Sequence, residues 1–293
     1  MPISLKTGSG GGGLPISAIL PLNATQTVYT PEEGDVWLRS GTITDDLTTY
    51  PKATTTLAAF FDNFFSNSSE VTYADAVITD GTIFWVISTG RIAYKYDVTG
   101  TYTGTSSNVS TSISTIRGGT WDGTNFWLVD QSDGNVKQFD TDFNYTGTFF
   151  STQGVSPTGI AWDGTYLYVG EDDVEDRNIY RYDSAGTYTN FSFPYNNETA
   201  TLKDITVLDG FLWLMEVGGK TFKYNLDGEY TGDFFEVVAT SNTTNPYGIT
   251  SDSDSFWIGG NDNSVVSEFT SYAGIAFLAF DTDSGKPLYV KVA

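Results

Sequence analysis

Two stretches of sequence decide the fold: GGTWDGTNFWLVDQ at residues 118–131 and GIAWDGTYLYVGED at residues 159–172. Each has a run of small or β-branched residues, then an Asp-Gly pair, then a run built on aromatic residues. Glycine accepts the positive φ of a tight hairpin turn and aspartate binds its own backbone there, so each stretch predicts two antiparallel strands. Further copies of this plan are DAVITDGTIFWVIS (75–88), DITVLDGFLWLMEV (204–217) and GITSDSDSFWIGGN (248–261), the last with Asp-Ser in place of Asp-Gly.

A second hairpin follows the first in each copy. The aromatic residue of the second strand recurs with a period in the low forties, at Trp85, Trp127, Tyr168, Trp213 and Trp257. A later aromatic residue, at Tyr96, Phe139, Tyr182, Tyr224 or Phe269, is followed six positions on by Tyr102, Tyr145, Tyr188, Tyr230 or Ile275. A constant offset predicts a hairpin of constant register. Four strands per repeat at this period predict an all-β fold with almost no helix, namely a β-propeller of four-stranded blades.

The number of blades depends on the two ends of the chain. GDVWLRSG (34–41) resembles the second strand of a repeat, and TTLAAFFDNFF (55–65) stands where the fourth strand of that copy is expected. This copy lacks a first strand, which the alternating tail KPLYVKVA (286–293) could supply. We therefore expect about six blades, five clear repeats and one composite of both termini. The alternative is five blades, with residues 1–50 as a separate anchor.

The composition excludes several kinds of chemistry. With 14 basic and 36 acidic residues the formal net charge is −22, so neither nucleic acid nor an anionic membrane is an expected partner. The chain has no cysteine and no histidine, which excludes disulfides, thiolate chemistry, a Ser-His-Asp triad and a histidine zinc site. There is no P-loop and no apolar stretch of membrane-spanning length.

One loop gathers acidic residues between a second and a third strand, in EDDVED. These candidate cation or ligand residues are Glu171, Asp172, Asp173, Glu175 and Asp176. Carboxylates in a loop can bind calcium, although the residues of a calcium-binding loop motif are absent, and a solvated acidic loop is the simpler interpretation. No cofactor is expected, with calcium left open.

The N-terminal region differs from the repeats. Residues 1–13 end in a flexible glycine run, and the segment that follows is apolar but interrupted by Pro15 and Pro21. We expect residues 1–33 to form an extended N-terminal arm and residues 34–293 to form the propeller. The candidate anchor residues in the arm are Leu14, Ile16, Ile19, Leu20 and Leu22.

The repeat WDGT-(Y/N)-(L/F)-(Y/W)-V/L, followed by IYRYD-x-x-G-x-YTG, resembles propeller repeats in structural proteins of tailed bacteriophages. The opening GDVWLRSGTITDDLTTYP is similar to the start of such virion proteins. The resemblance implies attachment to other virion proteins through the N-terminal arm, multiple copies in the assembly, and a propeller presented outward from an extracellular particle. It provides no catalytic residues.

These observations predict a non-enzymatic virion protein, a tail or fibre-like appendage, with host surface glycans as a further candidate partner. Two alternatives stay open. One is a secreted or surface interaction module. The other, less favoured because the chain has no histidine, is a calcium-dependent propeller hydrolase.

Overall fold

The computed structural model describes residues 59–66, 70–173, 175, 177–195, 201–237, 245–253, 255–260, 265–271, 275–280 and 287–291. These residues form strands and turns and no helix. The chain divides into two compact units, one of residues 58–271 and one of residues 1–57 with 272–293. The expected boundary between residues 33 and 34 lies outside the described residues and stays a prediction.

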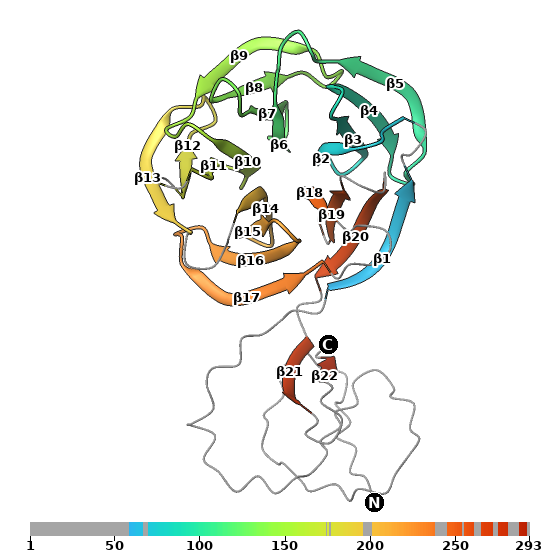
Figure 1. Ribbon diagram of the computed structural model, residues 1–293, viewed down its shortest axis with the longest axis vertical. Helices are drawn as coiled ribbons and strands as arrows, with labels where there is room; N and C mark the ends of the chain where they lie inside the picture. Colours follow the sequence, from blue (N-terminus) through green and yellow to red (C-terminus); the bar gives the residue numbers. More distant parts are fainter. Residues whose placement is uncertain are drawn as a thin grey trace, which may run out of the picture. The chain divides into compact units, whose positions relative to one another are not determined.

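The first unit contains five antiparallel four-stranded sheets, which are the blades of a propeller (Figure 1). Blade 1 contains β2 (Ala74–Thr79), β3 (Ile83–Ser88), β4 (Ile92–Asp97) and β5 (Tyr102–Asn108). Blade 2 contains β6 (Ile116–Trp121), β7 (Phe126–Asp130), β8 (Asn135–Phe139) and β9 (Tyr145–Ser151). Blade 3 contains β10 (Pro157–Trp162), β11 (Leu167–Glu171), β12 (Asn178–Tyr182) and β13 (Tyr188–Pro194). Blade 4 contains β14 (Leu202–Leu208), β15 (Phe211–Glu216), β16 (Lys220–Asn225) and β17 (Tyr230–Glu236). Blade 5 contains β18 (Pro246–Ser251), β19 (Ser255–Gly260), β20 (Val265–Ser271) and β1 (Ala59–Ser66).

The ring closes within blade 5, where strands from opposite ends of the unit pair. β1 runs antiparallel to β20, from Ala59 opposite Ser271 to Ser66 opposite Val265. In Figure 1 the blue β1 lies on the outside of the red-orange β20. The pairing covers a strand edge that would otherwise be exposed.

The closure confirms the alternative of five blades over the composite sixth blade. The segment 55–65 does contribute a fourth strand, as expected, but to the last blade. The C-terminal tail does not complete the ring: β22 (Pro287–Lys291) pairs with β21 (Ile275–Phe280) in a two-stranded sheet of the second unit. The physical reason is that β1 already occupies the outer edge of β20. For the same reason the hairpin register expected from Phe269 to Ile275 is not formed in the fifth copy.

A β-bulge interrupts every innermost strand near its start. The register shifts between Ala74 and Ala76 in blade 1, and the same shift occurs in the other four blades. A bulge leaves a residue unpaired and re-aims its side chain. The residues at the bulges are Asp75, Arg117 with Gly118, Thr158, Lys203 and Tyr247.

The core lies between consecutive blades. Trp85, Trp127 and Tyr168 are each at most 1% exposed, so the repeated aromatic position fills the space between blades. The indole N–H of Trp127 donates to Asp122 Oδ2 at 2.6 Å, and that of Trp257 donates to Asp252 Oδ2 at 2.7 Å. The aspartate that begins the turn therefore also orients the aromatic residue five positions later.

At two junctions between neighbouring blades a buried phenylalanine ring fills an aromatic slot. At one junction the phenylalanine belongs to an outermost strand, and at the other it belongs to a turn. Between blades 2 and 3 the ring is Phe150 of β9, whose centroid lies 5.7 Å from Trp127 and 4.8 Å from Tyr182. Between blades 1 and 2 the equivalent position of β5 is Ser107. There the slot contains Phe143 from the adjacent turn, 4.8 Å from Trp85 and 5.4 Å from Phe139.

The turns match this exchange. A Cβ atom on Gly186 would collide with Phe150, and one on Gly228 would collide with Phe193. Phe143 takes the corresponding turn position in blade 2 and keeps its left-handed backbone, with φ of 61°. The junction of blades 2 and 3 thus has phenylalanine on the outer strand and glycine in the turn, whereas the junction of blades 1 and 2 has serine on the outer strand and phenylalanine in the turn.

Candidate functional site

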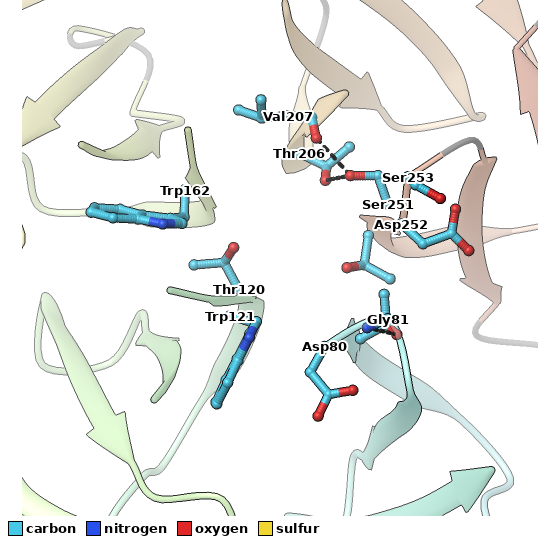
Figure 2. A pocket seen from close by; sticks show the side chains of 12 residues that line it. Asp80, Gly81, Thr120, Trp121, Trp162, Thr206, Val207, Ser251, Asp252 and Ser253 are labelled. Carbon is cyan, nitrogen blue, oxygen red and sulfur yellow. Dashed lines mark hydrogen bonds between the residues drawn. The ribbon is translucent and has the colours of Figure 1, made fainter. Parts of the chain in front are cut away.

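A pocket opens where the five innermost strands end, at the centre of one face of the propeller. It has a volume of about 280 Å³, and all five blades contribute to its wall (Figure 2). The residues that line it are Thr79, Asp80, Gly81, Thr120, Trp121, Trp162, Thr206, Val207, Thr250, Ser251, Asp252 and Ser253. We call this the axial pocket.

The same register position carries a different side chain in each blade at this pocket. The residue of the innermost strand that pairs one position before the repeated aromatic residue of the second strand is Thr79, Trp121, Trp162, Val207 or Ser251. The two tryptophans therefore come from neighbouring blades, Trp121 from blade 2 and Trp162 from blade 3. The axial pocket is aromatic on one flank and lined by hydroxyl groups on the other (Figure 2).

Both indoles are partly exposed and are supported from below. The Trp121 ring lies 4.5 Å from the ring of Phe126, and Trp162 packs against the cluster that contains Trp127 and Phe150. Figure 2 shows the two rings running outward from the middle of the pocket. Each indole is thus held in place while part of its surface faces solvent.

Hydroxyl groups form the other flank. Thr206 Oγ1 and Ser251 Oγ lie 3.0 Å apart, and Ser251 Oγ donates to the carbonyl of Val207 at 2.6 Å. The Thr120 hydroxyl has no hydrogen-bond partner among the residues that the structure describes. It is therefore available to a ligand.

The two aspartates of the wall serve the turns instead of the pocket. Asp80 Oδ1 accepts the backbone N–H groups of Thr82 and Ile83, at 2.7 and 2.9 Å. Asp252 accepts the N–H of Ser255 at 2.9 Å in addition to the indole N–H of Trp257. Both side chains point away from the middle of the pocket in Figure 2. The surface offered to a ligand is therefore indole and hydroxyl.

Below the axial pocket the innermost strands close on one another. Cβ atoms on Gly118 or Gly159 would overlap the neighbouring strand, and Gly248 lies directly against Ala76. Asp204 takes this position in blade 4 and is fully buried. Its carboxylate accepts the N–H groups of Ile205 at 2.9 Å and Ile249 at 3.0 Å. Burial raises the pKa of Asp204 well above its usual range, against the opposing effect of these donors.

A second group of polar side chains stands at the other end of the innermost strands, on the bulges. We call Asp75, Arg117, Lys203 and Tyr247 the bulge cluster. Arg117 donates from Nη1 to the Tyr247 hydroxyl and from Nε to Gln131 Oε1, the latter at 2.8 Å. Lys203 Nζ lies 4.4 Å from the centre of the Tyr247 ring. Burial raises the pKa of Asp75 to about 6, and the positive charge of Arg117 opposes that rise.

The structure does not bring the acidic loop residues together on one centre. Glu171 ends β11 and is fully buried, and its Oε2 accepts the N–H of Ser156 at 2.9 Å. Asp172 forms an ion pair with Arg177 at 3.7 Å, and Asp173 accepts the N–H of Glu175 at 2.9 Å. Burial raises the pKa of Asp172, against the opposing effects of its hydrogen bonds and nearby cations.

Asp176 lies outside the described residues, as do the anchor residues Leu14, Ile16, Ile19, Leu20 and Leu22. Within the described part of the chain no three acidic side chains form a group that could hold a metal ion. Calcium binding by the loop stays a prediction. No described residue belongs to a helix that is long and apolar enough to cross a membrane.

Neither the axial pocket nor the bulge cluster was predicted from the sequence. Trp121 and Trp162 are the residues immediately before an Asp-Gly pair, where the other copies have threonine, leucine and serine. The bulge position likewise differs in every copy. The signal in the sequence that could have indicated both sites is a position that varies between copies of an otherwise regular repeat.

Comparison with known proteins supports the fold. No family model matches the sequence, and no curated protein matches it. Among solved structures, glutaminyl cyclase from Myxococcus xanthus superimposes with a TM-score of 0.58 at 7% identity, covering 73% of this chain and 97% of that chain. Virginiamycin B lyase from Staphylococcus aureus gives a TM-score of 0.44 at 16% identity, covering 79% and 74%. A nidogen/laminin complex gives 0.48 at 14% identity, covering 74% and 79%.

These likenesses extend to the fold alone. The chain is a β-propeller repeat protein, as the repeat resemblance implied, but none of the three structures is named as a phage protein. The expectation that the chain is not an enzyme is corrected, because the propeller that superimposes with a TM-score of 0.58 is an enzyme by name. The fold therefore gives no ground for excluding catalysis.

Proposed function

We propose that this chain is a carbohydrate-binding propeller that recognises a surface glycan through the axial pocket. One observation carries the proposal: two neighbouring blades place partly exposed indoles, Trp121 and Trp162, on one flank of a pocket whose other flank is lined by hydroxyl groups.

The two flanks match the two kinds of surface on a sugar ring. A sugar presents C–H groups on its faces, which stack on an aromatic ring, and hydroxyl groups around its edge, which exchange hydrogen bonds with threonine and serine. Indole has a large apolar face and a polar N–H, so it suits a ligand of mixed character. Thr120 supplies a hydroxyl with unused capacity between the two flanks.

The size of the pocket limits the ligand. A volume of about 280 Å³ lies just below the range of about 300–1,000 Å³ that is usual for small-molecule sites. We expect one sugar ring to enter, with the rest of the glycan outside. Because the carboxylates of the wall are engaged in the turns, a neutral sugar is favoured over an amino sugar that carries a positive charge.

The setting that we propose is a virion, where other virion proteins hold the N-terminal arm and several copies face the host. The support is the resemblance of the repeat and of the opening residues to structural proteins of tailed bacteriophages. Several copies on one particle would convert weak single-site binding of one sugar ring into strong attachment.

The test is a microarray of bacterial surface glycans, followed by calorimetric titration of the strongest hit. Trp121→Ala and Trp162→Ala should each weaken binding by about 2 kcal/mol, or roughly 30-fold, the magnitude for an aromatic residue at the centre of a contact. Phe149→Ala is the matched control, because Phe149 is an aromatic residue of β9 with 56% of its surface exposed, away from the pocket. Unchanged affinity in both tryptophan variants would refute the proposal.

A further inference from the structure

We infer that the bulge cluster is a second binding site, which takes a small oxyanion, a carboxylate or phosphate group, between Arg117 and Lys203. This inference goes beyond the proposed glycan site, since it concerns other residues at the other end of the innermost strands.

The two cations come from different blades and meet at one tyrosine. The guanidinium carbon of Arg117 lies 5.6 Å from the centre of the Tyr247 ring, and Lys203 Nζ lies 4.4 Å from it. The guanidinium carbon of Arg117 and Nζ of Lys203 therefore lie within about 10 Å of each other. The bulges of β6, β14 and β18 hold these three residues in place, so the arrangement is built by the fold and does not depend on a long loop.

Neither cation has a carboxylate oxygen within ion-pair distance in the described part of the chain. The ion pairs found there belong to Lys137, with Asp130 at 2.8 Å and Asp133 at 2.6 Å, and to Arg177 with Asp172. The sequence has 36 acidic residues for 14 basic ones. Arg117 and Lys203 therefore stand close together without a carboxylate at ion-pair distance, although the charge of Asp75 acts on Arg117 and that of Asp172 on Lys203. A bound anion would complete the neutralisation of the two cations.

The cluster retains hydrogen-bond donors for such an anion. Arg117 has five N–H donors, of which the contacts with Gln131 and Tyr247 use two, and lysine has three. A planar guanidinium beside an ammonium group is a donor set suited to carboxylate or phosphate oxygens. All four side chains of the cluster are partly exposed, so a small ion can reach them from solvent.

Asp75 is the competing charge within the cluster. It is close enough to Arg117 for the two charges to interact, but the pair is not within ion-pair distance. Replacing this carboxylate by an amide removes its repulsion of an incoming anion. An Asp75→Asn variant should therefore bind an anion more tightly than the unaltered protein at pH 7.5.

The experiment is a calorimetric titration of the full chain at pH 7.5 with sodium phosphate and, separately, with sodium acetate. We expect saturable binding of one ion per chain, weakened at least 10-fold by Arg117→Gln and by Lys203→Gln, and tightened about threefold by Asp75→Asn. Arg117→Lys, which keeps the charge but loses the planar donor set, should weaken binding less than Arg117→Gln and separates the effect of charge from that of geometry. Preference for phosphate or for acetate identifies which oxyanion the site takes.

Lys223→Gln is the matched control, because Lys223 belongs to the same blade as Lys203 and lies 3.9 Å from the centre of the Phe211 ring. This variant should bind as the unaltered protein does. The inference is overturned if neither ion binds saturably, or if Lys223→Gln weakens binding as much as Lys203→Gln. Trp121→Ala should leave anion binding unchanged, so the outcome is independent of the proposed glycan site.

Discussion

The aromatic slot between blades 1 and 2 makes a quantitative prediction about two substitutions. Ser107→Phe combined with Phe143→Gly would recreate the arrangement that Phe150 and Gly186 form between blades 2 and 3. Ser107 and Phe143 already contact each other, since Ser107 Oγ donates to the Phe143 carbonyl at 2.9 Å. We expect each single substitution to destabilise the propeller and the pair to restore most of the loss.

The magnitudes follow from the burial and the backbone. Phe143 is fully buried, and removing such a ring costs about 3–5 kcal/mol. Glycine regains about 1 kcal/mol, because φ is 61° at this position. Phe143→Gly should therefore cost about 2–4 kcal/mol. Ser107→Phe inserts a second ring into a filled slot and loses one hydrogen bond, which together cost about 2–4 kcal/mol.

The assay is a double-mutant cycle by urea denaturation. The free energies of unfolding of the four proteins are compared with one common slope for their dependence on urea concentration. Independent sites would give a combined loss of about 4–8 kcal/mol, whereas a shared slot predicts a double variant within about 2 kcal/mol of the unaltered protein. Simple addition of the two losses would refute the shared slot. Phe150→Ala, in the slot that already has the other arrangement, should lose stability to about the same degree as Phe143→Gly.

Three further outcomes follow from the same structure. Burial raises the pKa of Asp75 in the folded state to about 6, above its unfolded value, so its contribution to stability is present below about pH 4 and is lost as the pH rises through 6. Thermal melts of Asp75→Asn should therefore show a gain in stability of about 1–2 kcal/mol at pH 8, after allowance for partial exposure, and no gain at pH 3.5. An equal gain at both pH values would contradict this. A chain that ends at residue 271 should retain the cooperative melt of the propeller, because β1 closes the ring, while deletion of residues 59–66 should abolish it; loss of the melt on removing residues 272–293 would contradict the five-blade closure. Deletion of residues 1–33 should leave the melt unchanged and prevent incorporation into particles, and normal incorporation, measured by immunoblotting of purified particles, would exclude the anchor.

The repeat predicted the blades because each copy carries its own turn chemistry. In blades 2, 3 and 5 the aspartate of the turn accepts a hydrogen bond from the aromatic residue five positions later, a contact local enough to be located in the sequence. The blade count was harder, since β1 lacks those marks and pairs with β20 some two hundred residues away. A closure made by non-local pairing leaves no local signal.

The site was harder still to predict. Trp121 and Trp127 belong to the same hairpin, in which Trp127 pairs with Thr120, the residue before Trp121. Trp127 is buried, whereas Trp121 lines the axial pocket. Residue type alone does not separate them. The bulge cluster depends on register shifts, which turn Arg117, Lys203 and Tyr247 out of the pairing, and a pattern of alternating residues does not reveal such shifts.

The most direct test of the account is a fluorine NMR titration of protein labelled with 5-fluorotryptophan, using the glycan that the microarray selects. The chain has seven tryptophans, and single substitutions assign their resonances. Binding in the axial pocket predicts that the resonances of Trp121 and Trp162 shift to saturation while those of the buried Trp85, Trp127, Trp213 and Trp257 stay in place. A saturating glycan that leaves Trp121 and Trp162 unshifted would contradict the account.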